Sequence, residues 1–486
     1  MSPPASGVKV RMYRHGFGDC FLLAFPTGDP DVAWYLLVDC GLFWSYRAVD
    51  GGPSQSQLLD AVAADVVAAT GGEIDALVIT HEHFDHLAGF RWSAPWNRLR
   101  QDAAYGELWL AWTEREGDPL ADDLRQESGL ALRMLSRVRG LLPVGELLDF
   151  SENTAQALAH VRSLFDDERI RTFDPGQVIS PLGEGGPRFF VLGPPRNRGL
   201  LRTNLREDEL YSRLRAAERH ALYAAAVGHG GDADPGEPFA RHHAWSEARA
   251  GEEDFFVERY GFDQPDGGAE HPAAWRRIDG EWLEALTDLA LQYDDYVNNT
   301  SLAFAVELPE SGRVLLFPGD AQAGNWLSWA DESEGLTFAG APEVTVADLL
   351  PRTVFYKVGH HGSHNATLAA KGLERMTSEE LVAFVPTDET WAWQTRESGW
   401  RMPYLPLYRA LLERTGGRLV QSDSGLPDRK PRMSAHPKHG GLPYSDADWQ
   451  SLQAQIADLG EPIAAFREEL VETDLFFEVE IADEGP

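Results

Sequence analysis

Three histidines and two carboxylates lie within the six residues from His81 to His86. The segment directly follows residues 74–79, a mostly apolar run that predicts a buried strand. Such polar groups do not favour a core, because each would lose its hydration without gaining a partner. Imidazoles and carboxylates are instead ligands that suit zinc or manganese. The segment therefore predicts a metal site, against the alternative of a polar loop in which Asp85 caps a helix.

The spacing of this segment divides its side chains between two ions. In an extended or tightly turning chain, His81 and His83 project to the same side. Asp85 and His86 fall on the turn that follows, where they can face a second ion. The pattern thus indicates a centre with two metal ions at the end of one strand.

Three further positions carry polar groups at predicted strand ends. Asp39 follows a short apolar run, and a carboxylate there can hold a ligand imidazole by its second nitrogen. Asp320 follows another such run, and its two oxygens can bridge two ions. His360 and His361 follow a third, and one of them can bind the second ion. The alternatives are a cap or a turn for each aspartate, and ordinary surface positions for the histidines.

The expected strands and helices must bring these groups together. Strands are expected at residues 8–13, 20–25, 34–38, 74–79, 107–113, 188–192, 301–308, 313–317, 354–358, 381–385 and 475–481. Helices are expected at residues 55–69, 120–142, 153–165 and 404–415 and over most of 446–470. Residues 196–296 are rich in Glu, Arg, Ala and His and predict a helical insertion, while residues 427–444 predict a loop.

Composition limits the partners of the chain. It has 486 residues, of which 43% are hydrophobic, so a sizeable core is expected. The 43 basic and 77 acidic residues give a net charge of −34, which repels polyanions at long range. This charge argues against a broad nucleic-acid-binding surface, although a local metal centre can still attract a phosphate.

The cysteines and the apolar runs bear on the compartment. Cys20 and Cys40 are the only cysteines, and reduced thiols in a cytoplasmic protein are expected. No run approaches the ~18 apolar residues of a membrane helix, and the N-terminus has no apolar core of a signal peptide. We therefore expect a cytoplasmic protein without a membrane segment.

In this order, the motifs resemble the signatures of the metallo-β-lactamase superfamily. They are similar above all to the metallo-hydrolase domains of bacterial DNA-uptake (competence) proteins. The segments that carry the resemblance are residues 16–20 (GFGDC), 37–41 (LVDCG), 81–86 (HEHFDH), 192–195 (LGPP), 299–302 (NTSL), 319–320 (GD) and 360–363 (HHGS). The resemblance implies a four-layer αβ/βα sandwich of two facing sheets with helices outside. The domain would span residues 1–425, with the insertion at 196–297, and residues 426–486 would pack on it as an extension.

The resemblance also assigns ligands. His81 and His83 would bind the first ion, and Asp85 and His86 the second. Asp320 would bridge the two ions. His360 or His361 would complete the second site, with His360 favoured because it lies nearer the strand end.

One departure from the family concerns the first ion. The superfamily usually has another histidine on the strand before the bridging aspartate, but residues 192–196 contain none. His220 or His229 from the insertion would substitute, or a water would take the place with weaker binding. The expected cofactors are two divalent ions, zinc first, with manganese as the alternative.

Such a centre supports hydrolysis, because two cations make a bridging water acidic and stabilise a developing oxyanion. Asp85 or Asp320 would orient the hydroxide. His364 would supply a proton to the leaving group, unless it is a solvated loop histidine. Lys357 and Ser363 would contact a phosphate, unless they pack and cap.

The expected function is a phosphodiesterase or nuclease acting on a nucleotide or a short single-stranded nucleic acid. Trp391, Trp393 and Trp400 would stack on a base, unless they belong to the core. One alternative is a hydrolase of a small ester, lactone or amide, and another is a metal-bound interaction module without turnover. The insertion would serve as a lid or as the contact for a protein partner or a second copy.

Overall fold

The computed structural model describes residues 1–43, 45–48, 51–90, 104–127, 156–203, 249, 251–260, 296–330, 336–395 and 399–484. The chain divides into two compact units, of which one comprises Met1–Asp122, Phe150–Glu209 and Asp295–Pro486. This larger unit contains both sheets and every predicted site residue that the structure describes. The other unit contains helix α9 (Asp254–Tyr260). The predicted helix at 120–142 is described over residues 120–127, which are helical, and its remainder and most of the predicted insertion lie outside the described residues.

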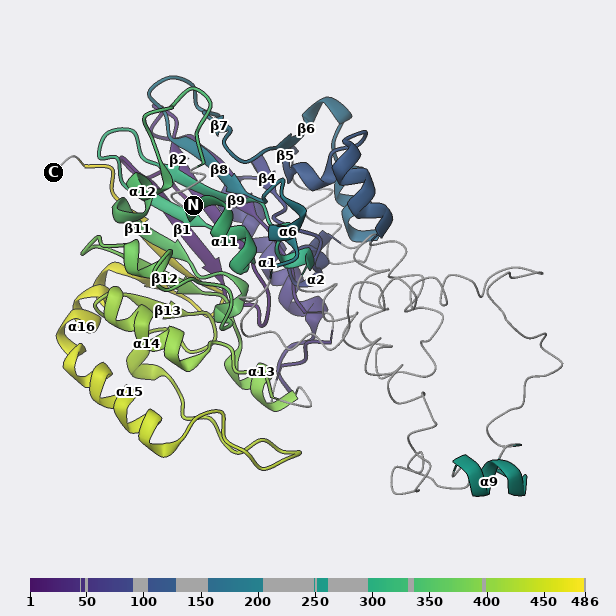
Figure 1. Cartoon of the computed structure of the whole chain (residues 1–486). Helices are drawn as coiled ribbons and strands as arrows, with labels where there is room; N and C mark the ends of the chain where they lie inside the picture. The colour runs from purple at the N-terminus through teal and green to yellow at the C-terminus, as the bar shows by residue number, and fades with distance from the viewer. Residues whose placement is uncertain are drawn as a thin grey trace. The chain divides into compact units, whose positions relative to one another are not determined.

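The larger unit is built on two sheets (Figure 1). The first sheet has the described strands, in spatial order, β14 (Val471–Glu472), β15 (Phe476–Ile481), β1 (Val8–Tyr13), β2 (Phe21–Pro26), β3 (Ala33–Val38), β4 (Glu73–Val78), β5 (Ala104–Ala111) and β6 (Ile170–Phe173). The second sheet has, in the same way, β13 (Leu419–Gln421), β12 (Val382–Val385), β11 (Thr353–Lys357), β10 (Val314–Phe317), β9 (Ala303–Glu307), β8 (Arg188–Gly193) and β7 (Val178–Ile179).

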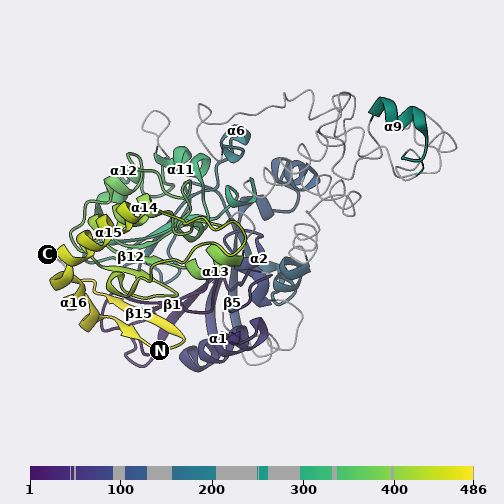
Figure 2. The same ribbon diagram turned by 90° about the horizontal axis from the view of Figure 1, so that it is seen from below.

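Helices cover the outer faces of both sheets. The described α-helices of this unit include α1 (Gln55–Thr70), α2 (Phe84–Leu87), α6 (Arg198–Leu201), α11 (Ala323–Ala330), α12 (Val346–Leu349), α13 (Glu389–Thr395), α14 (Leu405–Arg414), α15 (Asp446–Asp458) and α16 (Gly460–Glu469). Figure 2 shows α1 against the first sheet and α12, α14 and α15 beyond the second. The predicted αβ/βα sandwich is therefore confirmed.

Side chains alternate between two cores along the strands of the first sheet. On β3, Trp34, Leu36 and Val38 face the second sheet, where they join its apolar side chains. Leu37 points the other way and packs with Leu59 and other apolar residues of α1. This period of two is what an extended strand imposes, and it explains why a strand buried on both faces is apolar throughout.

Helix α1 begins and ends where its sequence carries capping signals. The Ser54 side chain accepts a hydrogen bond from the backbone of Gln57, and the Gln57 side chain accepts one from the backbone of Ser54. Gly71 ends the helix in the left-handed conformation with φ of 68°. The chain then enters β4, which leads directly into the histidine-rich segment.

Residues 426–486 are an integral part of the sandwich. Strand β15 pairs antiparallel with β1, and Val479 lies opposite Val10. The same segment supplies α15 and α16, whose buried Leu452 and Ile463 join the core between the sheets and their outer helices. The predicted extension thus completes one edge of the first sheet. Among the described residues, no helix is both long and apolar enough to cross a membrane.

Candidate metal centre

Parallel strands direct four polar segments toward one place. Strands β3 and β4 run parallel in the first sheet, and β10 and β11 run parallel in the second. Their carboxyl ends are followed by Asp39, by the segment 80–86, by Asp320 and by His361. Because the carboxyl ends of parallel strands share one edge of a sheet, polar side chains at these positions converge.

Four of the predicted ligands form a compact cluster, namely Asp85, His86, Asp320 and His361. One ligand atom from each lies within 4.8 Å of all the others, and the four residues are buried. Nε2 of His361 lies 2.8 Å from Oδ2 of Asp85, and Nε2 of His86 lies 3.2 Å from Oδ2 of Asp320. Nε2 of His86 and Oδ2 of Asp320 make no hydrogen bond with the described residues although both are buried. Two carboxylates and two imidazoles with such atoms facing inward are a donor set that fits a divalent ion.

Backbone and carboxylate groups orient both histidines of this cluster. Oδ2 of Asp39 lies 2.8 Å from Nδ1 of His86, and the same carboxylate accepts hydrogen bonds from the backbone and the hydroxyl of Thr80. Nδ1 of His361 lies 2.6 Å from the carbonyl oxygen of Pro386. Nδ1 of each ring is therefore engaged by a hydrogen-bond partner, and Nε2 is the nitrogen that faces the cluster.

His81 and His83 form a separate pair beside the cluster. Nε2 of His81 faces Nδ1 of His83 at 3.0 Å, and both residues are buried. Burial lowers the pKa of His81 well below its ordinary value and that of His83 to about 4. Both rings are thus neutral at physiological pH, which is the form that binds a metal.

The described residues do not extend this pair to a group of three ligands whose atoms lie within 4.8 Å of one another. Pro194 directly follows β8, and its carbonyl oxygen accepts a hydrogen bond from Nε1 of Trp112. His220 and His229, the predicted substitutes, lie outside the described residues. Asn298 is buried, and its amide opposes the effect of burial on the pKa of His83. No sequence pattern pointed to Asn298 beyond its place next to the segment that begins at Asn299.

The preference for His360 over His361 as a ligand does not fit the structure. Both residues have a positive φ, 43° for His360 and 53° for His361, so the chain turns sharply between them. The ring of His361 enters the cluster, whereas Nδ1 of His360 lies 2.9 Å from the Ser363 hydroxyl. The backbone N–H of His360 donates to Oδ1 of Asp320 and helps to hold this strained turn.

Lys357 and Ser363 do not lie where a phosphate would reach them. Lys357 ends β11 and is only 2% exposed. Its ammonium group bonds to Asp19, to Oδ1 of Asp320 at 3.1 Å and to the carbonyl of Gly319 at 2.8 Å. Ser363 is buried, and its hydroxyl donates to Asn365 and contacts His360. The predicted substrate contacts of Lys357 and Ser363 are therefore corrected to structural support of the cluster.

Asp19 is a site residue that sequence reasoning missed. It is 1% exposed, pairs with Lys357 and lies 3.8 Å from Nδ1 of His86 and 3.7 Å from Nδ1 of His361. Its only sequence signal was the position in the segment GFGDC before β2. The carboxylate thus adds a negative charge directly behind the four ligands.

The electrostatic field of the cluster favours a cation. Burial alone would lower the pKa of His86, but the charges of Asp320, Asp39 and Asp19 raise it well above its ordinary value. Burial would raise the pKa of Asp320, yet Lys357 and His86 hold it well below that of a free aspartate. A field that stabilises imidazolium inside the protein also stabilises a divalent metal ion.

Aromatic side chains close one side of the cluster. The ring of Phe17 lies 4.1 Å from that of His361 and 5.1 Å from that of Trp391. Trp391 and Trp393 are buried, while Trp400 is partly exposed and lies 5.9 Å from Phe17. Two of the three tryptophans that were predicted to contact a base therefore belong largely to the packing.

His364 lies on the same loop as His361 but faces solvent. Its ring is 6.1 Å from that of Tyr404. Because its side chain is exposed, His364 is accessible to a substrate. Its role as a general acid stays a prediction.

Residues 16–129 match the model of the metallo-beta-lactamase superfamily. The matched segment contains Asp19, Asp39 and the ligands from His81 to His86, whereas Asp320 and His361 lie beyond it and join them in space. No curated protein matches the sequence.

Residues 16–129 thus match a superfamily that generally comprises metal-dependent hydrolases that bind divalent metals. The prediction of an enzyme with this fold is confirmed at the level of the superfamily. The closer resemblance to competence proteins stays a prediction.

Proposed function

We propose that the protein is a metal-dependent phosphodiesterase that acts on a nucleotide or a short single-stranded nucleic acid. The observation that carries the proposal is the cluster of Asp85, His86, Asp320 and His361 beside the neutral pair His81 and His83. Together these residues offer ligands for two ions. The negative charge of Asp320 favours a higher pKa of both His81 and His86, so its field reaches both groups. Zinc is the first candidate for both ions, and manganese is the alternative.

Each oxygen of Asp320 has a different task. Oδ1 accepts hydrogen bonds from Lys357 and from the backbone N–H of His360. Oδ2 makes no hydrogen bond with the described residues and faces Nε2 of His86. Oδ2 is therefore the Asp320 oxygen that would help to hold the ions, while Lys357 fixes the carboxylate in place.

The bound ions would supply hydroxide near neutral pH and stabilise the charge that grows on the phosphoryl oxygens. Asp85 would orient the attacking water by accepting its hydrogen bond, since its Oδ2 lies in the cluster, 2.8 Å from Nε2 of His361. His364 would donate a proton to the leaving oxygen from the exposed loop. Phe17 would exclude bulk water from the side of His361.

Two arguments favour a short phosphodiester as the substrate. A centre with two metal ions stabilises both the attacking and the leaving oxygen of an in-line displacement. The net charge of −34 disfavours long polyanions, because repulsion outside the centre grows with substrate length. We place the enzyme in the cytoplasm, where nucleotides are abundant and its two free cysteines stay reduced.

The test is hydrolysis of bis(p-nitrophenyl) phosphate with added zinc or manganese. Changing a residue that only hydrogen-bonds to a metal ligand lowers activity by up to about 100-fold. Asp320 is itself a proposed ligand, so Asp320→Asn should reduce turnover by more than about a hundredfold. Asp31→Asn, a change of the same type at an exposed loop residue, should leave turnover unchanged.

Equal turnover in Asp320→Asn and the wild type would contradict the proposal. Metal-dependent hydrolysis of p-nitrophenyl acetate without any turnover of the phosphodiester would instead identify a hydrolase of small esters. Absence of all turnover in a protein shown to contain metal would indicate an interaction module.

A further inference from the structure

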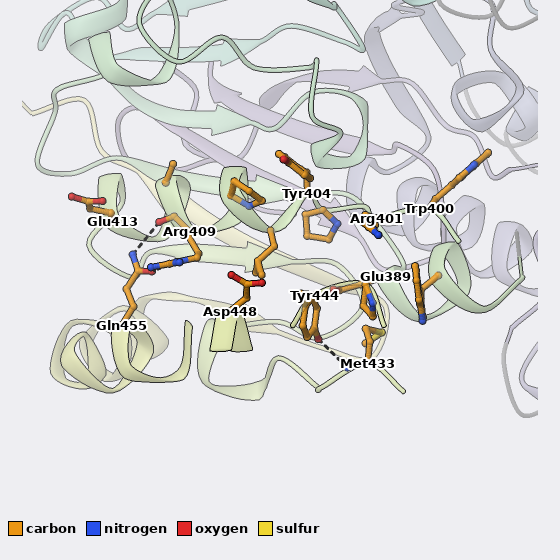
Figure 3. Close-up of a pocket in the computed structure, with 16 residues that line it drawn as sticks. Glu389, Trp400, Arg401, Tyr404, Arg409, Glu413, Met433, Tyr444, Asp448 and Gln455 are labelled. Atoms are coloured by element: carbon orange, nitrogen blue, oxygen red, sulfur yellow. Dashed lines mark hydrogen bonds between the residues drawn. The ribbon is translucent and has the colours of Figure 1, made fainter. Parts of the chain in front are cut away.

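A cavity of about 510 Å³ lies between α14, α15 and the loop that precedes α15. Figure 3 shows Tyr404 and Arg409 on one wall and Tyr444, Asp448 and Gln455 on the other. The cavity is open on one side and lies within the larger unit of the chain.

The walls of the cavity are rigid and aromatic. Tyr444 stacks on Trp449 with an angle of 10° between the rings, and its hydroxyl oxygen accepts the backbone N–H of Met433. Trp393 is buried and donates through Nε1 to the carbonyl of Ser434. Trp400 and Tyr404 complete the aromatic lining. Fixed rings of this kind bind a flat ring by stacking at little cost in conformational freedom.

The charges in the lining nearly cancel. Glu389 is one of three acidic residues in the lining, and it is paired with the buried Lys430. The two other acids, Glu413 and Asp448, are matched in number by Arg401 and Arg409. A cavity without excess positive charge does not favour a phosphate. It suits a neutral ring that both donates and accepts hydrogen bonds.

Arg409 is positioned as a hydrogen-bond donor within the cavity. Its Nε donates to Oε1 of Gln455 at 3.3 Å, and Nε2 of Gln455 donates back to the Arg409 carbonyl at 3.0 Å. This exchange fixes the guanidinium against α15. Arg409 could thus donate to a ring nitrogen or carbonyl, while the Asp448 carboxylate could accept from an amino group.

The cavity adjoins the metal centre through two contacts. The backbone N–H of Tyr404 donates to the carbonyl of Gly362 at 2.8 Å, directly after His361. Trp400 contacts Phe17, which in turn packs on the ring of His361. The wall of the cavity and the loop that carries a ligand are therefore one continuous piece of structure.

We propose that this cavity binds the nucleobase of the substrate whose phosphodiester lies at the metal centre. The proposal rests on the proposed phosphodiesterase function. Stacking on Trp400 and Tyr404 holds the ring, and Arg409 and Asp448 bond its polar edge. The cavity accordingly selects nucleotides over phosphodiesters that have no base.

The test is calorimetric titration of the full-length protein with adenosine, which carries a base and no phosphate. Adenosine should bind the wild type, and Trp400→Ala and Tyr404→Ala should each weaken binding about tenfold, as expected for one lost stacking ring. Tyr404 is 37% exposed, so its removal should leave the fold intact. Tyr35→Ala, which removes a partly buried tyrosine of β3 outside the cavity, should bind adenosine like the wild type.

Lack of adenosine binding by the wild type, or equal binding by all variants, would overturn the proposal. The result is independent of turnover, because the probe has no bond to cleave. If adenosine binds as expected while no phosphodiester is hydrolysed, the cavity is not part of a phosphodiesterase site and the proposal also fails. Competitive inhibition of phosphodiester turnover by adenosine, lost in Tyr404→Ala, would support it.

Discussion

Asp39 offers the sharpest test of how the protein positions a metal ligand. Its Oδ2 lies 2.8 Å from Nδ1 of His86 and 2.7 Å from the hydroxyl of Thr80. Its Oδ1 accepts the backbone N–H of Thr80 at 2.8 Å. In Asp39→Asn, the amide nitrogen must replace one of these oxygens and then face at least one N–H donor. The amide nitrogen therefore faces either Nδ1 of His86 or the backbone N–H of Thr80, so the support of His86 is weakened directly in one orientation and through Thr80 in the other.

The backbone does not contribute to this effect. Asp39 has φ of 54°, a left-handed conformation that asparagine tolerates as well as aspartate does. The loss of charge acts in the same direction as the lost hydrogen bond, because Asp39 is one of the carboxylates that raise the pKa of His86. Partners of this type change metal affinity by about 10- to 100-fold, or roughly 1.4–2.8 kcal/mol.

The assay is competition for zinc between the protein and a chromophoric chelator at constant pH. Asp39→Asn should bind zinc about 10- to 100-fold more weakly than the wild type at one of its sites. Asp31→Asn serves as the matched control at an exposed loop. An affinity of Asp39→Asn equal to that of the control would refute the role assigned to this carboxylate.

Three further predictions concern the same unit. Lys357→Met should lower the free energy of unfolding of the metal-free protein by about 3–5 kcal/mol in urea, because it leaves Asp19 and Asp320 as buried charges without their partner; a change below about 1 kcal/mol would contradict this. His361→Ala should abolish one bound metal ion by elemental analysis while His360→Ala retains it, and the reverse result would restore His360 as the ligand. Burial and the charge of Asp423 raise the pKa of Asp388 from 3.8 to about 6, so the folded state binds this proton more tightly than the unfolded state does. Stability contributed by the protonated group is thus lost as the pH rises from about 4 to about 6. Relative to the wild type, Asp388→Asn should gain stability over that range, by up to about 3 kcal/mol, and a pH-independent difference in urea midpoints would argue against the assignment.

The sequence predicted the strands that carry the site because their signals are local. Apolar runs of four to eight residues form buried strands, and the observed β3, β4, β10 and β11 lie within a few residues of their predicted positions. The polar residues just after these strands were recognised as candidate ligands because an apolar core does not require polar side chains. Convergence of Asp39, Asp320 and the segment 81–86 followed from the resemblance, which implied two facing sheets and a shared set of metal ligands.

Features that depend on contacts between distant residues were missed. Whether His360 or His361 enters the cluster depends on two left-handed residues and on the Asp320 carboxylate 40 positions earlier. Lys357 was predicted to contact a phosphate unless it packs, and the structure buries it where Asp19 and Asp320 neutralise its charge. Short elements such as β13 and α12 were also missed, since three or four residues carry too little periodicity to be recognised.

The nucleobase cavity was only partly foreseen. The tryptophans at 391, 393 and 400 were noticed as a group, but their roles differ in the structure. The opposite wall comes from α15 and its preceding loop, which no local pattern connects to them. Only the packing of residues 426–486 onto the sandwich creates the space between them.

The central claim is that Asp85, His86, Asp320 and His361 bind a metal ion. Its most direct test is a crystal structure of the protein grown with manganese, with anomalous scattering measured at the manganese edge. The account predicts an anomalous peak within bonding distance of Nε2 of His86, Nε2 of His361 and Oδ2 of Asp320. A protein that turns over substrate with manganese but shows no peak among these four residues would contradict it.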